Sequence, residues 1–253
     1  AGDGWAGAWR GTNDIGLAAG SATYPNGVTA SPTGNRGQGT TPVAVFRPLD
    51  ASLWIDMYDA ASLTEVTRYY SVLFSKTDGG SSSDWLAIGF GRDIAPGTYA
   101  DTGWTENGMT FGVGSSSSDL LVATPYGVLS SVSTLSPNVN VTSDALFAVG
   151  KVQTRSDNKL DFFLEVYEST ETVGAEPGAG DWDFTYTRDT AGLPSYAQNM
   201  QIDKFGVISG SSGNTSMVDE ILIGETWGDV TTPEPATMTL LAAGGLLLAR
   251  RRR

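Results

Sequence analysis

The sequence predicts an all-β protein, an antiparallel β-sandwich that is followed by one short transmembrane helix at the C-terminus. Three observations favour this fold class. The 253 residues include 32 glycines but only 17% charged residues, a composition typical of turn-rich β structure. Ten β-capable segments alternate with turn sequences, and no stretch before residue 231 has a convincing helical period. A chain of this length that is 40% hydrophobic can also bury a substantial core.

The predicted strands begin at residue 53. Residues 1–50 are rich in Gly, Thr, Pro and Asn, with Trp5 and Trp9 as large early anchors, and we expect them to be irregular but attached. The ten predicted strands are residues 53–58, 66–75, 85–90, 109–113, 120–123, 146–152, 160–167, 184–187, 202–208 and 218–223.

Two of these strands indicate which faces are buried. Residues 160–167 alternate, so that Phe162, Leu164 and Val166 share one face, which we expect to be core. The opposite face mixes carboxylates and aromatic rings and is expected to be wet or ligand-facing; it carries Asp161, Phe163, Glu165 and Tyr167. Residues 66–75 have bulky side chains on both faces, as expected for a central strand that is covered on both sides.

The composition excludes several classes of chemistry. The chain has no Cys and no His, which removes cysteine nucleophiles, Ser-His-Asp triads and the usual zinc sites. Its net charge is −13, and four of the 15 basic residues are the last four. The remaining body carries 11 basic and 28 acidic residues, so we expect no binding to nucleic acid.

The chain starts at Ala1 without an initiator Met, a basic region or an apolar run. We expect that a signal peptide has been removed before Ala1. An arbitrary boundary is the alternative.

The C-terminal segment has three elements in a fixed order. Pro233, Glu234 and Pro235 are followed by 14 apolar or small residues, 236–249, and then by the terminal cluster Arg250, Arg251, Arg252 and Arg253. As a helix the apolar stretch would span roughly 21 Å, short of a hydrocarbon core of about 30 Å. Snorkelling arginines and local bilayer thinning cover much of this deficit. The residues expected to anchor the helix in the membrane are Ala236, Leu240, Leu241, Leu246, Leu247 and Leu248.

This order resembles the PEP-CTERM sorting signal of Gram-negative bacteria. The resemblance implies export, recognition by an exosortase-type membrane protease and removal of the tail. Pro233, Glu234 and Pro235 would be the sorting motif, and Arg250 to Arg253 the cytoplasmic stop. The resemblance also implies that the protein is first anchored in the inner membrane as an intermediate and is then located at the cell surface or in the extracellular matrix.

A second resemblance covers residues 217–231. Their pattern of Val-Asp-Glu-Ile, Gly and Thr-Trp-x-Asp-Val is similar to the last strand of concanavalin A-like lectin/glucanase (LamG-like) jelly rolls that precede such sorting tails. Leu222, Glu225 and Gly228 depart from the expected pattern. The resemblance implies a jelly-roll sandwich over residues 1–230 and a sorting and anchor segment over residues 231–253.

The carboxylates do not form the glucanase pattern of that fold. Asp161 and Glu165 share a face but are about 13 Å apart along a strand, too far for a glycosidase pair. Asp181 and Asp183 are roughly 7 Å apart if extended, a spacing that permits acid and base roles, although a charged loop edge is the alternative. Neither pair is expected to be catalytic.

No cofactor is expected, although structural calcium is possible. The loop residues that suggest it are Asp78, Asp84, Asp157 and Asn158; each is also an ordinary turn former. No metal ligand can be assigned.

Phe163 and Tyr167 are the candidate platform for stacking on sugar rings. The alternative for this pair is cross-strand packing or a second buried face.

The sequence therefore predicts a non-enzymatic surface or matrix protein with a structural or adhesive role. Two alternatives stay open: a lectin-like module that binds polysaccharide and, less favoured, a glycoside hydrolase. The expected partners are the sorting protease, the bacterial membrane and, in the lectin-like alternative, a polysaccharide.

Overall fold

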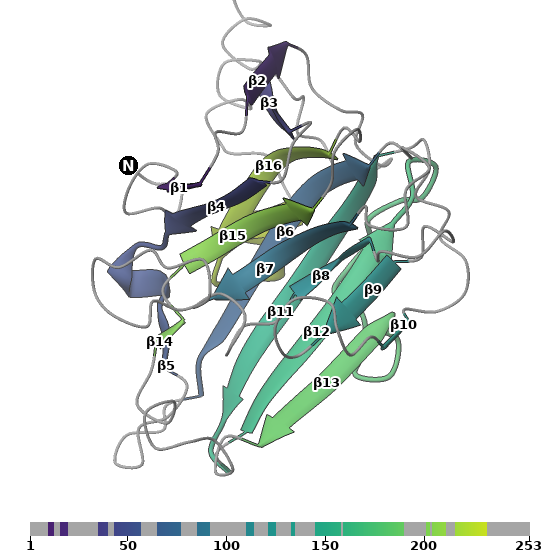
Figure 1. Ribbon diagram of the computed structural model, residues 1–253. Helices are drawn as coiled ribbons and strands as arrows, with labels where there is room; N and C mark the ends of the chain where they lie inside the picture. The colour runs from purple at the N-terminus through teal and green to yellow at the C-terminus, as the bar shows by residue number, and fades with distance from the viewer. Residues whose placement is uncertain are drawn as a thin grey trace, which may run out of the picture.

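The structure is a computed structural model. It describes residues 10–12, 16–19, 35–39, 43–56, 65–76, 85–91, 110–113, 121–124, 133–134, 145–157, 159–189, 201–202, 204–210 and 216–231. This part of the chain forms two seven-stranded antiparallel sheets that lie one over the other (Figure 1). The predicted antiparallel β-sandwich is confirmed.

Sheet 1 is assembled from strands that are distant in the sequence. In spatial order it contains β1 (Arg10–Thr12), β4 (Val43–Pro48), β15 (Lys204–Gly210), β7 (Trp85–Gly91), β8 (Thr110–Val113), β9 (Leu121–Thr124) and β10 (Ser133–Thr134). The register pairs Val207 of β15 with Val45 of β4 on one side and with Ile88 of β7 on the other.

Sheet 2 contains the longest strands. In spatial order it contains β13 (Phe184–Asp189), β12 (Lys159–Tyr167), β11 (Leu146–Arg155), β6 (Thr67–Lys76), β16 (Ser216–Gly224), β3 (Asn35–Gly39) and β2 (Gly16–Ala19). A small sheet pairs β5 (Ile55–Asp56) with β14 (Gln201–Ile202). The described helices are the 3-10 turn η1 (Ala51–Leu53) and α2 (Trp227–Thr231).

Each of the ten predicted strands contains strand structure, and two predictions need correction. Residues 1–50 are not irregular throughout, because β1 to β4 lie within them. Residues 53–58 do not form one strand: the 3-10 turn η1 ends at Leu53, and β5 occupies only Ile55–Asp56. The Asp50 side chain starts η1 by accepting the Ser52 N–H at 2.9 Å.

The space between the sheets is filled by an apolar inner cluster. β-branched and aromatic side chains favour extended backbone and pack well on its pleated surface. The inner cluster consists of Leu49, Leu53, Ile55, Tyr70, Val72, Phe74, Leu86, Ile88, Phe90, Phe111, Leu146, Ala148, Val152, Leu160, Phe162, Leu164, Val166, Phe184, Phe205, Val207, Val218 and Ile223. Tyr70 of sheet 2 enters an aromatic group on sheet 1, with its ring 4.7 Å from Phe90 and 5.9 Å from Phe111.

A second cluster covers the opposite face of sheet 2. This outer cluster consists of Tyr69, Leu73, Phe147, Val149, Tyr167, Met217 and Val230. It is covered by α2 and by residues 168–183, which we call the covering segment. Val173 of this segment packs against the cluster. β6 therefore has buried side chains on both faces, as its sequence predicted.

A bulge in β16 sets which of its side chains reach each cluster. The pairing with β6 shifts between Asp219, opposite Leu73, and Leu222, opposite Ser71. The extra residue reverses the alternation, so Leu222 reaches the outer cluster while Ile223 reaches the inner one.

Among the described residues, no helix is both long enough and apolar enough to cross a membrane. The predicted membrane helix and the sorting motif lie beyond residue 231, outside the described residues.

Candidate functional site

An open hollow of about 220 Å³ lies over the ends of β11, β12 and β13 on the outer face of sheet 2. Aromatic residues, two threonines and a charged pair line it together with one alanine: Arg155, Asp161, Phe162, Phe163, Ala179, Thr185, Tyr186 and Thr187. The register places Asp161 opposite Thr187 and Phe163 opposite Thr185, so alternation brings these four side chains to one face.

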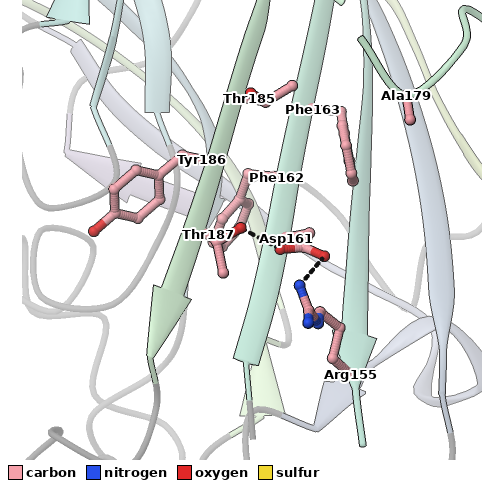
Figure 2. A pocket seen from close by; sticks show the side chains of 8 residues that line it. All are labelled: Arg155, Asp161, Phe162, Phe163, Ala179, Thr185, Tyr186 and Thr187. Carbon is pink, nitrogen blue, oxygen red and sulfur yellow. Dashed lines mark hydrogen bonds and ion pairs between the residues drawn. The ribbon is translucent and has the colours of Figure 1, made fainter. Parts of the chain in front are cut away.

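Asp161 is held at the centre of this hollow (Figure 2). Its Oδ1 accepts the Thr187 hydroxyl at 2.5 Å, and its Oδ2 lies 3.4 Å from Arg155 Nη1. Arg155 also binds the Asp157 carboxylate through Nε and Nη2, at 3.0 and 2.9 Å. The two carboxylates raise the pKa of the Arg155 guanidinium, Asp161 more than Asp157. The site therefore holds fixed donors and acceptors close to an aromatic ring.

The two rings of the predicted stacking platform are not brought together on an open surface. Phe163 lines the hollow and is partly buried. Tyr167 is only 9% exposed, and its ring packs 6.4 Å from that of Phe147 in the outer cluster. Tyr167 thus belongs to a second buried face, the alternative that the sequence had left open.

Glu165 and Asp183 join the covering segment to β12. The Asp183 N–H donates to Glu165 Oε2 at 3.1 Å, and the Val166 N–H donates to Asp183 Oδ2 at 2.9 Å. Each carboxylate thus accepts a backbone hydrogen bond across the junction. Asp161 and Glu165 point to the same face as predicted, but their partners differ: Arg155 and Thr187 bind the first, Asp183 the second.

Burial and neighbouring carboxylates change the ionisation of this junction. Burial, more than any other cause, raises the pKa of Glu165 to about 7, and the negative charges of Asp183, Glu171 and Asp181 act in the same direction. The hydrogen bond from the Asp183 N–H opposes them. Burial also raises the pKa of Asp183. The predicted pair Asp181 and Asp183 flanks Trp182, which is 7% exposed.

A cationic side chain fastens the middle of the covering segment. Lys151 Nζ lies 2.6 Å from Glu176 Oε1, 4.5 Å from the centre of the Phe163 ring and 5.2 Å from that of Trp182. Glu176 also accepts the Tyr69 hydroxyl at 2.9 Å. A lysine enclosed by rings and paired with a carboxylate is bound more firmly than an exposed one. Residue spacing gave no sign of this contact, because its members are up to 107 positions apart in the sequence.

In the part of the chain that the structure describes, no three acidic side chains are grouped so that they could hold a metal ion. Asp157 is bound instead by Arg155 and by Lys159 Nζ, at 3.3 Å. The other suggested residues, Asp78, Asp84 and Asn158, lie outside the described residues.

Comparison with known families assigns the C-terminal segment. Residues 231–253 match the PEP-CTERM protein-sorting motif. The sorting-signal resemblance is therefore confirmed, over Pro233, Glu234, Pro235, the apolar stretch and the arginines. A signal of this kind marks an exported protein and implies an exosortase as its processing partner.

Comparison with solved structures finds similar folds at low sequence identity. One is an endo-beta-1,4-glucuronan lyase from the fungus Trichoderma reesei, with a TM-score of 0.44, 15% identity and coverage of 90% of this chain and 93% of that chain. Another is lectin II from Ulex europaeus, with a TM-score of 0.40, 14% identity and coverage of 76% and 87%. A third is a legume lectin-like domain from Entamoeba histolytica, with a TM-score of 0.42, 11% identity and coverage of 81% and 90%. Likeness at this level says nothing of what this chain binds or cleaves. No curated protein gives a significant match.

Proposed function

We propose that this chain, which carries a PEP-CTERM sorting signal over residues 231–253, is a cell-surface or extracellular-matrix protein with a non-enzymatic structural or adhesive role. The sorting signal is the observation that carries the proposal. The tail anchors the precursor in the inner membrane, an exosortase-type protease processes it, and the β-sandwich remains as the working part at the surface.

The contacts of the candidate carboxylates support a non-enzymatic body. A general acid or base needs a carboxyl group that can reach the substrate. Asp161 is bound by Arg155 and Thr187, and Asp183 accepts the Val166 N–H. Each of these side chains has a structural partner, which favours a scaffold over an acid–base pair.

Deletion of residues 233–253 tests the sorting part of this proposal. In a bacterium that has the sorting protease, the full chain should partition with membranes before processing and reach the surface afterwards. The truncated chain should appear as soluble protein in the periplasm or the medium. Identical fractionation of the two proteins would contradict the anchor.

Polysaccharide binding is a second candidate function, favoured by the hollow over β11 to β13. Sugars are recognised by hydroxyl, carboxylate and guanidinium groups around an apolar ring face, and Thr187, Asp161, Arg155 and Phe163 supply such a set. A glycan array should then detect binding by the full chain that is lost in Asp161→Ala and weakened in Phe163→Ala. Glu168→Gln, on the exposed part of the covering segment, is the control. Release of reducing sugar from a bound glycan would instead favour the glycoside hydrolase.

A further inference from the structure

The last described element, α2, is short, but it is held by many contacts. Val230 of α2 is fully buried in the outer cluster, and Thr231 is 7% exposed. The buried Ser71 hydroxyl of β6 donates to the Val230 carbonyl at 2.7 Å, and the Thr231 hydroxyl donates to the Trp227 carbonyl at 2.8 Å. The Ser71 contact satisfies a carbonyl group that the end of a helix leaves without a partner.

The start of α2 is closed by a reciprocal cap. The Asp229 N–H donates to the Thr226 hydroxyl at 3.3 Å, and Asp229 Oδ2 accepts the N–H groups of Thr226 and Glu225 at 2.9 and 3.0 Å. This is a capping box with Asp at its third helical position. The cap demands glycine at position 224, where a Cβ would lie 2.4 Å from the Asp229 Cβ.

The covering segment closes over α2 from the solvent side. Trp227 Nε1 donates to the Gly174 carbonyl at 3.0 Å, and the centres of the Trp227 and Trp182 rings are 5.8 Å apart at an interplanar angle of 81°. The Tyr69 ring of β6 lies 6.4 Å from Trp227 at an interplanar angle of 84°. Since Lys151 and Glu176 fasten this same segment, α2 is held between the sheet and its cover.

The sorting motif begins at the last residue of this packed helix. Its match starts at Thr231, which is the last residue of α2. Pro233 follows two residues later, and two residues of chain reach at most about 7 Å. A protease needs several residues of accessible backbone around the bond that it cleaves, and folded segments supply these only by opening locally.

We infer that α2 is a clasp: while it is packed on the outer cluster, the protease cannot reach the beginning of the sorting motif. Tail processing therefore depends on release of this helix from the outer cluster. The inference rests on the proposed sorting function. In the processing step a backbone C–N bond breaks, and the acyl group forms a new bond to the oxygen of water or to the nitrogen of an acceptor amine. The departing amine takes up the proton that this nucleophile loses, and α2 contributes no atom. Cleavage then follows the fraction of molecules in which α2 has opened.

Two glycines near the cap permit a test in both directions. Gly224→Ala places a Cβ against Asp229 and should open the clasp. Gly228 lies within α2, where an added Cβ would meet only the Thr226 hydroxyl, at 3.8 Å. Gly228→Ala should therefore favour the helix and close the clasp. Asp229→Ala removes the cap without adding bulk, and Ile88→Val in sheet 1 is the control for a comparable loss of stability far from α2.

The experiment is a pulse-chase of the full chain in a bacterium that has the sorting protease, with intact mass distinguishing tailed from processed protein. Relative to the wild type, processing of Asp229→Ala should be about fivefold faster, and Gly224→Ala should be processed at least as fast as Asp229→Ala. Processing of Gly228→Ala should be slower than that of the wild type by up to about fivefold. Ile88→Val should match the wild type. Hydrogen exchange of residues 226–231 in the purified full chain should follow the same order.

Three outcomes would overturn the inference, and they are distinguishable. A wild-type chain that keeps its full mass would remove the proposed sorting function and the clasp with it. A wild-type chain that is processed, with all four variants processed at its rate, would remove the clasp alone. Acceleration by Ile88→Val equal to that by Asp229→Ala would assign the effect to global stability and would also overturn the clasp.

Discussion

The two faces of sheet 2 are both covered, but by different means. The inner face is covered by a second sheet and, among the described residues, by the inner cluster, whose side chains are apolar apart from the hydroxyl of Tyr70. The outer face is covered by the covering segment and α2, which are fastened through Lys151, Glu176 and the Glu165–Asp183 junction. The first arrangement is nearly independent of pH, whereas the second depends on charge. We therefore expect contacts on the inner face to contribute most of the free energy of unfolding, and contacts on the outer face to control processing of the tail.

Adjacent residues of β12 give the largest expected contrast between the faces. Phe162 is fully buried in the inner cluster, whereas Phe163 is partly exposed beside the hollow. Phe162→Ala should lower the free energy of unfolding by about 4 kcal/mol, because it leaves a cavity between the sheets. Phe163→Ala should cost about 1 to 2 kcal/mol. Urea unfolding of the chain truncated after residue 232 measures both, and equal losses would contradict the proposed division.

Gly150 of β11 gives the next largest effect. A Cβ there would lie 2.0 Å from Tyr70 Cζ, because the Tyr70 ring lies against the glycine backbone. Gly150→Ala should therefore cost about 3 kcal/mol by overpacking the inner cluster. Gly174→Ala is the control in the covering segment, since an added Cβ there meets nothing within 4 Å. A Gly150→Ala protein as stable as the control would show that the ring can move away.

The fold was predictable where strands are long and bury bulky side chains. The alternation of β12 and the bulky side chains on both faces of β6 can be read from the two-residue period within each strand, and the structure has both. β3 has the sequence Asn-Arg-Gly-Gln-Gly, which has no apolar residue. It is a strand because Gly37 pairs with Val218 of β16 and with Leu17 of β2. Such tertiary context overrides local propensity, and no local pattern contains it.

The candidate site was predictable only in part for a similar reason. The shared face of Asp161 and Glu165 follows from strand alternation. The return of the chain from residue 168 to Asp183, which covers Tyr167, is a non-local arrangement with no periodic signal. α2 is too short for a helical period, although Thr226-x-x-Asp229 is a readable cap signature.

The third prediction concerns pH and the Glu165–Asp183 junction. The pKa of Glu165 is raised to about 7 from an ordinary value of 4.5, so the folded protein holds this proton more tightly than the unfolded chain. Its contribution is fully present below about pH 4.5 and is lost as pH rises through about 7; the raised pKa of Asp183 acts in the same direction. Because solvent screens a half-exposed carboxylate, we expect a loss of about 1 kcal/mol between pH 5 and 7.5.

Glu165→Gln should remove most of this pH dependence. Glu168→Gln, which neutralises an exposed glutamate on the same segment, controls for the loss of one charge from an acidic protein. Urea midpoints at the two pH values give the difference for each protein. A Glu165→Gln protein with the same pH dependence as the Glu168→Gln control would show that the junction does not couple to folding.

The smallest effect is expected at the one polar group of the inner cluster, and its sign is informative. The Tyr70 hydroxyl is completely buried and has no hydrogen-bond partner among the described residues, and burial raises its pKa well above the ordinary value. A buried hydroxyl without a partner costs free energy that a phenyl ring does not. Tyr70→Phe should therefore leave stability unchanged or raise it by up to about 1 kcal/mol.

Tyr69→Phe, on the neighbouring residue of the outer face, should instead lower stability by about 1 kcal/mol, because it removes the hydrogen bond to Glu176. Urea unfolding of the two variants compares one hydroxyl on each face of the same strand. A clear loss of stability in Tyr70→Phe would mean that the inner hydroxyl has a partner, such as a buried water, and that the inner face is not sealed by apolar contacts alone.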